Sequence, residues 1–119
     1  MKTISIDGAS QSSGARHPGP LLRDQVLPGL GLSVSQAARD LGISRQTLHR
    51  IFDSSANITP EMAARLETLC GVSSTFWMRL QCAYDLDRAH VELADALLQI
   101  PRHTLSAKIM KQLGALNGR

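Results

Sequence analysis

A short polar run between Leu41 and Phe52, LGISRQTLHRIF, carries side chains suited to reading DNA. Arginine can donate two parallel hydrogen bonds to O6 and N7 of guanine, and glutamine can pair similarly with N6 and N7 of adenine. A serine beside a helix N-terminus can help to hold a phosphate. The run contains all three residue types and no acid. The candidate DNA-binding residues are Ser33, Ser35, Gln36, Ser44, Arg45, Gln46, Thr47, His49 and Arg50.

The same run contains the turn of a helix-turn-helix. Gly42 can adopt the left-handed conformation that ends one helix, and Ser44 can cap the next, from Arg45 to about Phe52. Ala38 is small enough to let the two helices approach, and Leu48 can fill the space between them. The competing interpretation is an ordinary helical hairpin whose polar face is only solvated.

The preceding helix is predicted to begin at Ser33. Ser33 and Gln36 have the spacing of a capping box, in which each side chain satisfies a backbone N–H group. Ala37, Ala38 and Leu41 follow at the spacing of one inward face.

Flanking segments also show helical signals. An N-terminal helix is expected to have Pro18 at its first position and to be ended by Pro28, Gly29 and Gly31. A further helix should start at Thr59, with Thr59 as its cap, and stop at Gly71. No stretch alternates convincingly as a strand would, so the predicted fold class is all-α.

A long apolar-periodic segment begins at a Ser73 cap and stops before Pro101, either as one helix or as two with a joint near His90. Phe76 and Leu80 are expected in the core. Trp77 and Tyr84 suit either an interface or the core, because both aromatic types are enriched at interfaces. These alternatives remain open from the sequence alone.

An amphipathic piece follows Thr104. Its apolar stripe is too exposed for a monomer unless it packs against something. The stripe predicts binding to a second copy or to a partner protein, or packing back onto the preceding helix. Its residues are Leu105, Ile109, Leu113 and Leu116.

Composition limits the function classes. The chain has 119 residues, 43% of them hydrophobic and 19% charged, with a net charge of +3, as expected for one globular domain with terminal extensions. Cys70 and Cys82 form no metal or redox motif and are expected to be small buried hydrophobes. Neither a signal peptide nor a membrane span is evident, which predicts a cytoplasmic protein.

Catalysis finds little support in the sequence. The four histidines are scattered, and neither a zinc-binding helix nor a phosphate-binding glycine loop is present. The sequence therefore predicts a protein that is not an enzyme and that uses no cofactor or metal.

Three segments carry a resemblance to a known family: HPG at His17, GISRQTL at Gly42 and FWMRLQCAYDL at Phe76. With them, residues 17–89 closely resemble the HigA family of antitoxins, helix-turn-helix proteins of the Cro and phage-repressor (XRE-like) type. The resemblance implies a five-helix domain, a homodimer on a palindromic operator, and a complex with a HigB-like toxin that cleaves mRNA. Val34 departs from the pattern, because many relatives carry a phosphate-binding glutamine there.

The resemblance also suggests how the chain is divided. Residues 1–16 are expected to be a flexible arm, residues 17–89 the DNA-binding domain and residues 90–119 a C-terminal helical extension. The leading hypothesis is an antitoxin that represses its own operon and neutralises the toxin by direct binding. The alternatives are a stand-alone repressor without a toxin and a protein-interaction module that has lost DNA binding.

Overall fold

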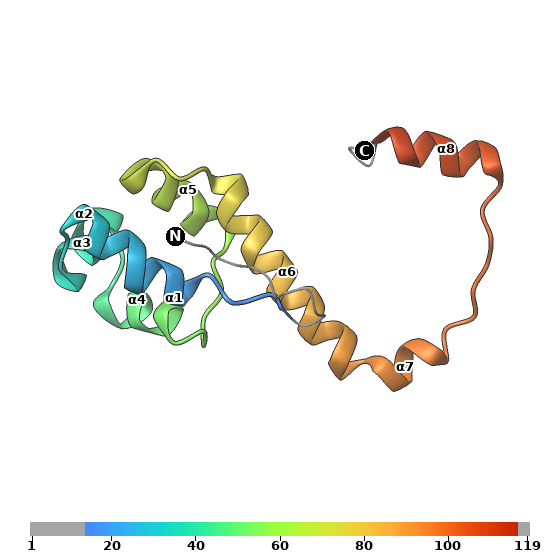
Figure 1. Ribbon diagram of the computed structural model, residues 1–119, viewed down its shortest axis with the longest axis horizontal. Helices are drawn as coiled ribbons and strands as arrows, with labels where there is room; N and C mark the ends of the chain where they lie inside the picture. The colour runs from blue at the N-terminus through green and yellow to red at the C-terminus, as the bar shows by residue number, and fades with distance from the viewer. Residues whose placement is uncertain (1–13, 117–119) are drawn as a thin grey trace.

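The computed structural model describes residues 14–116, and every regular element in that range is helical (Figure 1). The elements are α1 (Gly19–Leu21), η2 (Leu22–Val26), α2 (Leu27–Leu30), α3 (Val34–Leu41), α4 (Arg45–Phe52), α5 (Pro60–Cys70), α6 (Ser74–Glu92), α7 (Ala94–Leu98) and α8 (Ala107–Leu116). The first three follow one another without a break and form one helix. The predicted all-α class, a five-helix domain with a helical extension, is confirmed. Most of the predicted N-terminal arm lies outside the described residues.

The first helix runs to Leu30, and Gly31, one of the residues predicted to end it, closes it with a φ of 71°. Pro28, also predicted to end it, lies within the helix. The turn before Pro28 is π-helical, with the N–H of Leu27 donating to the carbonyl oxygen of Leu22. Proline has no N–H and crowds the preceding turn of an ordinary α-helix, and we attribute its acceptance here to this wider turn. Pro18 is the N-cap, one position earlier than predicted.

Gly19 brings the first helix into close contact with α4. A Cβ at this position would lie 1.8 Å from the carbonyl oxygen of Ile51, so no larger residue fits. The N–H of Gly19 donates to Nδ1 of the buried His17 at 2.9 Å. The His17 ring in turn packs edge-on against Tyr84 of α6 at 5.1 Å. This short segment therefore joins α1, α4 and α6.

A single apolar cluster holds the body together. Its buried members are Leu22, Leu27, Ala37, Ala38, Leu41, Leu48, Ile51, Phe52, Ile58, Met62, Ala63, Leu66 and Trp77. Trp77 is fully buried. Of the two possibilities that the sequence left open, an interface residue or a core residue, Trp77 is therefore a core residue. The prediction that Phe76 is a core residue was wrong: it is 41% exposed and packs edge-on against Trp77. Apolar residues occupy adjacent positions of α6 here, so the helical spacing alone did not distinguish Phe76 from Trp77. The inward face was predicted one residue too early in the sequence.

The burial of four further residues, on α5 and α6, can be compared with the predictions. Leu80, which was predicted to lie in the core, is only half-buried and is not a member of the core cluster, and Tyr84 is half-buried as well. Cys82 is exposed, which contradicts the prediction that it is buried, whereas Cys70 of α5 is half-buried. Cys82 lies on α6 away from Trp77 and Gln81, the two residues that this helix buries.

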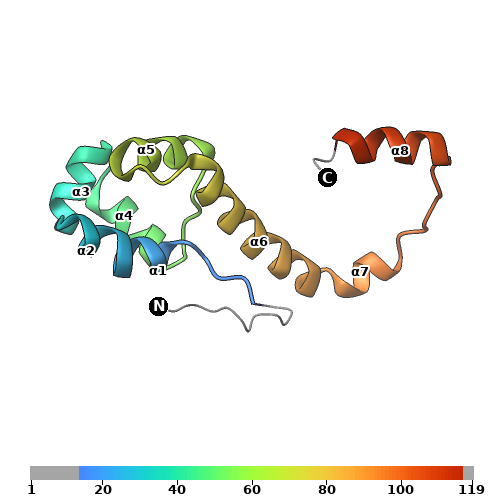
Figure 2. The ribbon, with the colours of Figure 1, turned by 45° about the horizontal axis from the view of Figure 1, so that its top comes forward.

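The C-terminal part of the chain leaves the body. α6 projects beyond α5 and ends at Glu92, close to the predicted joint at His90. α7 follows, and an irregular segment then leads to α8, which lies away from α6 in both views (Figures 1 and 2). Among the described residues, no helix is both long enough and apolar enough to cross a membrane.

Candidate nucleic-acid interface

The turn between α3 and α4 has the predicted geometry. Gly42 ends α3 in the left-handed conformation, with a φ of 75°. The N–H of Ile43 donates to the carbonyl oxygen of Ala38 at 3.0 Å, which closes the end of α3. Ser44 then starts α4 by accepting the N–H of Thr47 at 3.0 Å. The two helices of a helix-turn-helix are thus joined by three residues.

α4 separates its apolar residues from its polar ones. Leu48, Ile51 and Phe52 are at most 2% exposed and fix the helix to the body. The opposite face is polar, and no residue of α4 is acidic. Of the predicted residues on it, Thr47 is half-buried and the following are exposed: Ser44, Arg45, Gln46, His49 and Arg50. The structure therefore brings these residues together on one outward face.

The hydroxyl groups at the start of α4 are already engaged. The Ser44 Oγ that accepts the Thr47 N–H also donates to Thr47 Oγ1 at 2.9 Å. These two side chains fix the N-terminus of α4 and leave Arg45 and Gln46 as the first side chains directed outward.

The residues at the start of α3 are arranged differently from the prediction. Ser33 caps the helix by accepting the N–H of Gln36 at 3.1 Å, as expected. The second bond predicted for the capping box, from the Ser33 N–H to the Gln36 side chain, was wrong. The Gln36 amide instead donates to Asp40 and accepts from Arg39, each at 2.7 Å, because both partners lie on the following turn of the same helix. Ser33 is exposed, and Ser35 and Gln36 are half-buried.

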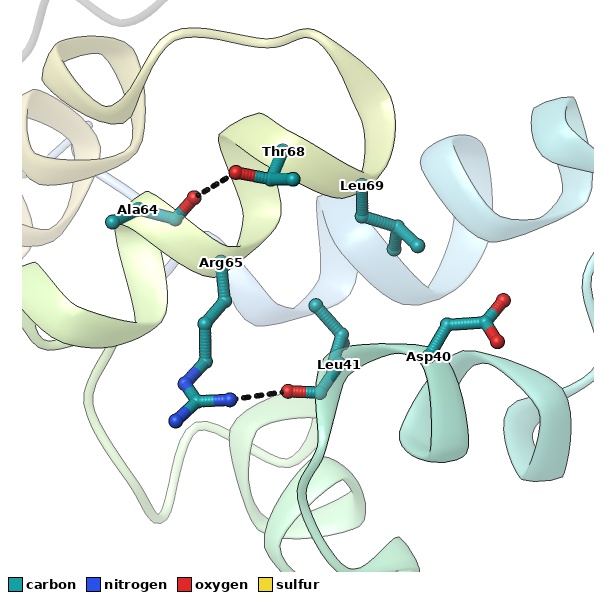
Figure 3. A pocket seen from close by; sticks show the side chains of 6 residues that line it. All are labelled: Asp40, Leu41, Ala64, Arg65, Thr68 and Leu69. Carbon is teal, nitrogen blue, oxygen red and sulfur yellow. Dashed lines mark hydrogen bonds between the residues drawn. The ribbon is translucent and has the colours of Figure 1, made fainter.

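Arg65 of α5 supports the turn from behind, and the sequence analysis missed it. Its Nη1 donates to the carbonyl oxygen of Leu41 at 2.7 Å, at the end of α3 (Figure 3). Its Nη2 forms an ion pair with Glu61 at 2.9 Å. Arg65 and Leu41 border an open pocket of about 620 Å³ between α3 and α5, together with Asp40, Ala64, Thr68 and Leu69. The four-residue spacing of Glu61 and Arg65 was the available sequence signal.

Gln81 of α6 plays a similar role for the segment that follows α4, and it was also missed. It is 3% exposed, and its Oε1 accepts the N–H of Ile58 at 2.8 Å. Its Nε2 donates to Asn57 and Asp85. A buried glutamine with its polar atoms satisfied fixes the segment that leads from α4 to α5.

His17 is the one buried titratable group near this framework whose pKa is shifted. Burial lowers the pKa of His17 from its ordinary value of 6.5, because the charged ring loses hydration. The backbone of Ala56 and then the charge of Asp85 oppose this shift, and Arg88 adds to it. Since Nδ1 accepts the Gly19 N–H, the neutral ring is the form that supports the first helix.

Metal chemistry has no visible site in this part of the chain. Within residues 14–116, no group of three or more His, Cys, Asp or Glu side chains is placed to hold a metal ion.

The capped turn, the buried inner face of α4 and its basic outer face define a helix-turn-helix unit of the kind that places a recognition helix in DNA. The comparisons agree with this class. The helix-turn-helix family matches residues 22–77, a range that begins in the first helix and ends at the buried Trp77.

Similar proteins extend the match over most of the chain. Virulence-associated protein I of Dichelobacter nodosus is 32% identical over 101 residues, covering 85% of this chain and 94% of that protein. The helix-turn-helix transcriptional regulator YddM of Escherichia coli is 36% identical over 76 residues, covering 63% and 81%. The chain belongs to the helix-turn-helix family.

The solved structures place it near the antitoxins. The Pseudomonas aeruginosa antitoxin HigA, solved with the higBA promoter, has 32% sequence identity and a TM-score of 0.69. The match covers 76% of this chain and 99% of HigA. The fold is therefore that of helix-turn-helix antitoxins. None of these three similar proteins is named as an enzyme.

Proposed function

We propose that the outer face of α4 lies in the major groove of operator DNA, and that the chain is an antitoxin that represses its own operon. The observation that carries this proposal is the exposed, acid-free face of α4 with Arg45 and Arg50, on a helix fixed by a capped turn and a buried inner face. The similarity to an antitoxin solved with a promoter supports it.

The geometry suggests a role for each candidate residue. Arg45 and Gln46 lie in the first turn of α4, the part of a recognition helix that reaches base edges. His49 and Arg50 follow one turn later and are exposed beside them. The hydroxyl groups of Ser44 and Thr47 position the helix, and the N-terminus that they cap can face a phosphate.

The start of α3 provides a second phosphate contact in this proposal. Ser33 and Ser35 lie at a helix N-terminus, where the backbone N–H groups favour an anion. Gln36 is close enough to contribute if its bonds to Asp40 and Arg39 exchange for one to DNA. These contacts would compensate for Val34 in the position where many relatives carry a glutamine.

Operator binding would require a homodimer. One short recognition helix reads only a few base pairs, whereas two related by a two-fold axis read a palindrome with half-sites about one helical turn apart. In this proposal residues 17–89 bind DNA, and residues 90–119 make contacts with protein. The protein needs no cofactor or catalytic group for this role and acts in the cytoplasm, where its operon lies.

The second partner would be a HigB-like toxin that cleaves mRNA, bound by direct complex formation. A toxin that handles RNA through a basic active site would be repelled by the basic face of α4, because like charges across an interface are costly. We therefore infer that the toxin binds away from Arg45 and Arg50. Similarity to the antitoxin HigA supports a toxin as the second partner.

A double substitution, Arg45→Ala with Arg50→Ala, tests the proposed separation. In cells that carry the toxin gene, the variant should lose repression of the operon and still rescue growth. Circular dichroism would verify that the variant remains folded. If a folded variant loses both activities, DNA and toxin share one surface and the proposed separation is wrong.

The runner-up function is a stand-alone repressor without a toxin. The similarity to YddM, named as a transcriptional regulator, favours it. Co-expression with the adjacent gene distinguishes the two, because only an antitoxin should co-purify with that product in a stoichiometric complex. An adjacent product that neither binds nor arrests growth would favour the repressor.

A further inference from the structure

An apolar groove runs beside α6 on its exposed side. It has a volume of about 500 Å³ and lies between α6 and the segment that leads into α5. α6 lines it with side chains spaced at four, four and three residues, which places them on one helical face. They are Met78, Cys82, Leu86 and Ala89, and Ile58 and Pro60 lie opposite. Leu86 is 51% exposed, so the groove presents a large apolar side chain to solvent.

α8 is an amphipathic helix whose large apolar side chains are exposed in the described part of the chain. Ile109, Met110 and Leu113 are 43%, 56% and 46% exposed. Both views show α8 apart from the body (Figures 1 and 2). A helix of ten residues is only marginally stable in water unless its apolar face is packed. The apolar side chains of α8 therefore need another surface to pack against if the helix is to be stable.

The charges of the two regions are complementary. Residues 99–116 contain Arg102, Lys108 and Lys111 and no acid. Residues 81–98 contain four acids, Asp85, Asp87, Glu92 and Asp95, with Arg88 as their one lysine or arginine. Asp85 lies in the groove lining itself. Docking of a basic amphipathic helix into an acidic, apolar groove would bury apolar side chains of both and bring opposite charges together.

We propose that α8 of one chain docks into the α6 groove of a second copy, and that the exchange is reciprocal. In both views α8 stands apart from α6 of its own chain, separated from it by α7 and an irregular segment, which favours a partner's groove over the groove of the same chain (Figures 1 and 2). A two-fold arrangement uses the contact twice and so doubles the buried area. The inference rests on the homodimer of the proposed function and specifies how it is held together.

Disulfide trapping tests this docking directly, because Cys82 lines the groove. In the full chain with Cys70→Ser, an added Ile109→Cys should form a disulfide with Cys82 of the partner under mild oxidation. The expected product is a covalent dimer of twice the 12.9 kDa chain. Lys111→Cys is the matched control, because it lies two residues further on, on another face of α8. Adding Cys82→Ser should abolish the covalent dimer.

The other outcomes overturn the proposal. A disulfide within one chain would mean that α8 returns to its own groove, and equal trapping by Lys111→Cys would mean that the contact is nonspecific. Sedimentation of the full chain with Leu113→Asp adds a second test. The charge should weaken dimerisation about tenfold or more, because a carboxylate would enter an apolar groove. An unchanged dimer without trapping would leave the homodimer standing and refute this docking, whereas a wild-type chain that stays monomeric would refute the homodimer as well.

Discussion

The body, which comprises the helices from α1 to α6, and the C-terminal arm, which comprises α7, α8 and the residues between them, have the same kind of amphipathic sequence. Among the described side chains, only the body buries its apolar ones. Leu48 and Trp77 in the body are fully buried. In the arm, by contrast, every residue from Leu93 to Leu113 is exposed. Helical periodicity therefore identifies a helix in both regions, but it does not say whether the apolar face has a partner in the same chain.

The body and the arm are also suited to different functions. In the body, packing and capping hold a polar face in a fixed orientation, which is what base recognition requires. In the arm, an uncovered apolar face remains available for another molecule. Substitutions in the body, compared with matched substitutions elsewhere where the chain offers one, test this separation.

The largest difference is expected for core truncation. Trp77→Ala should lower the free energy of unfolding by about 3–5 kcal/mol, because it removes a fully buried aromatic side chain and leaves a cavity. Leu98→Ala in α7 should change it by less than about 0.5 kcal/mol, because Leu98 is 81% exposed. Urea unfolding at one fixed protein concentration measures both. Equal losses would mean that the arm belongs to the same cooperative unit as the body.

A smaller loss is expected behind the turn. Arg65→Met keeps much of the aliphatic stem and removes the donor to Leu41, which should cost roughly 1–2 kcal/mol. Arg79→Met on the exposed face of α6 is the matched change and should cost less than about 0.5 kcal/mol. If the two variants unfold at the same urea concentration, Arg65 does not support the turn.

Helix capping should show a smaller contrast. Ser44→Ala removes the oxygen that accepts the Thr47 N–H at 3.0 Å and should cost about 1 kcal/mol. Ser106→Ala removes the corresponding cap of α8, where Oγ accepts the Ile109 N–H at 3.3 Å. Because α8 lies outside the packed body, the loss of its cap should change the unfolding free energy of the monomer, measured at low protein concentration, by only a few tenths of a kcal/mol. A reversed order in thermal unfolding would contradict the assignment of the body as the cooperative unit.

The smallest expected change depends on pH. The unfolded chain binds a proton at His17 more readily than the folded chain, because burial lowers the folded pKa below 6.5. The stability that comes from neutral His17 is therefore present above about pH 6.5 and is lost as the pH falls through the lowered pKa. His17→Asn, which keeps an acceptor and cannot titrate, should flatten this dependence in unfolding measurements between about pH 8 and pH 5. If the unfolding free energy changes with pH in the same way in the wild type and in His17→Asn, His17 does not contribute to the pH dependence.

The parts of this fold that follow local rules were predictable from the sequence. Ser44, Thr59 and Gly42 act within one turn of their own helices, so residue type and spacing identified the caps and the turn. The exposed face of α4 was predictable for the same reason.

The parts that depend on three-dimensional contacts were not predictable. Trp77 and Phe76 are neighbouring aromatic residues of α6, and the packing of α6 against α5 and the rest of the core decides which of them is buried. Arg65 and Gln81 bond to backbone groups more than twenty residues away, at Leu41 and Ile58. A single sequence carries no signal for such pairs. Whether Arg45 and Arg50 contact bases remains a prediction.

The central claim is that the body, through α4, binds DNA, and a binding titration tests it most directly. The wild-type chain and Arg45→Ala with Arg50→Ala would be titrated, at one salt concentration, against DNA from upstream of the chain's own gene. A control variant, Arg16→Ala with Arg79→Ala, removes the same charge from exposed positions outside α4. The α4 variant should lose at least about thirtyfold in affinity, since each lost bidentate contact costs about 1–3 kcal/mol, while the control stays close to wild type. An α4 variant that is folded and binds as tightly as the wild type would contradict the account.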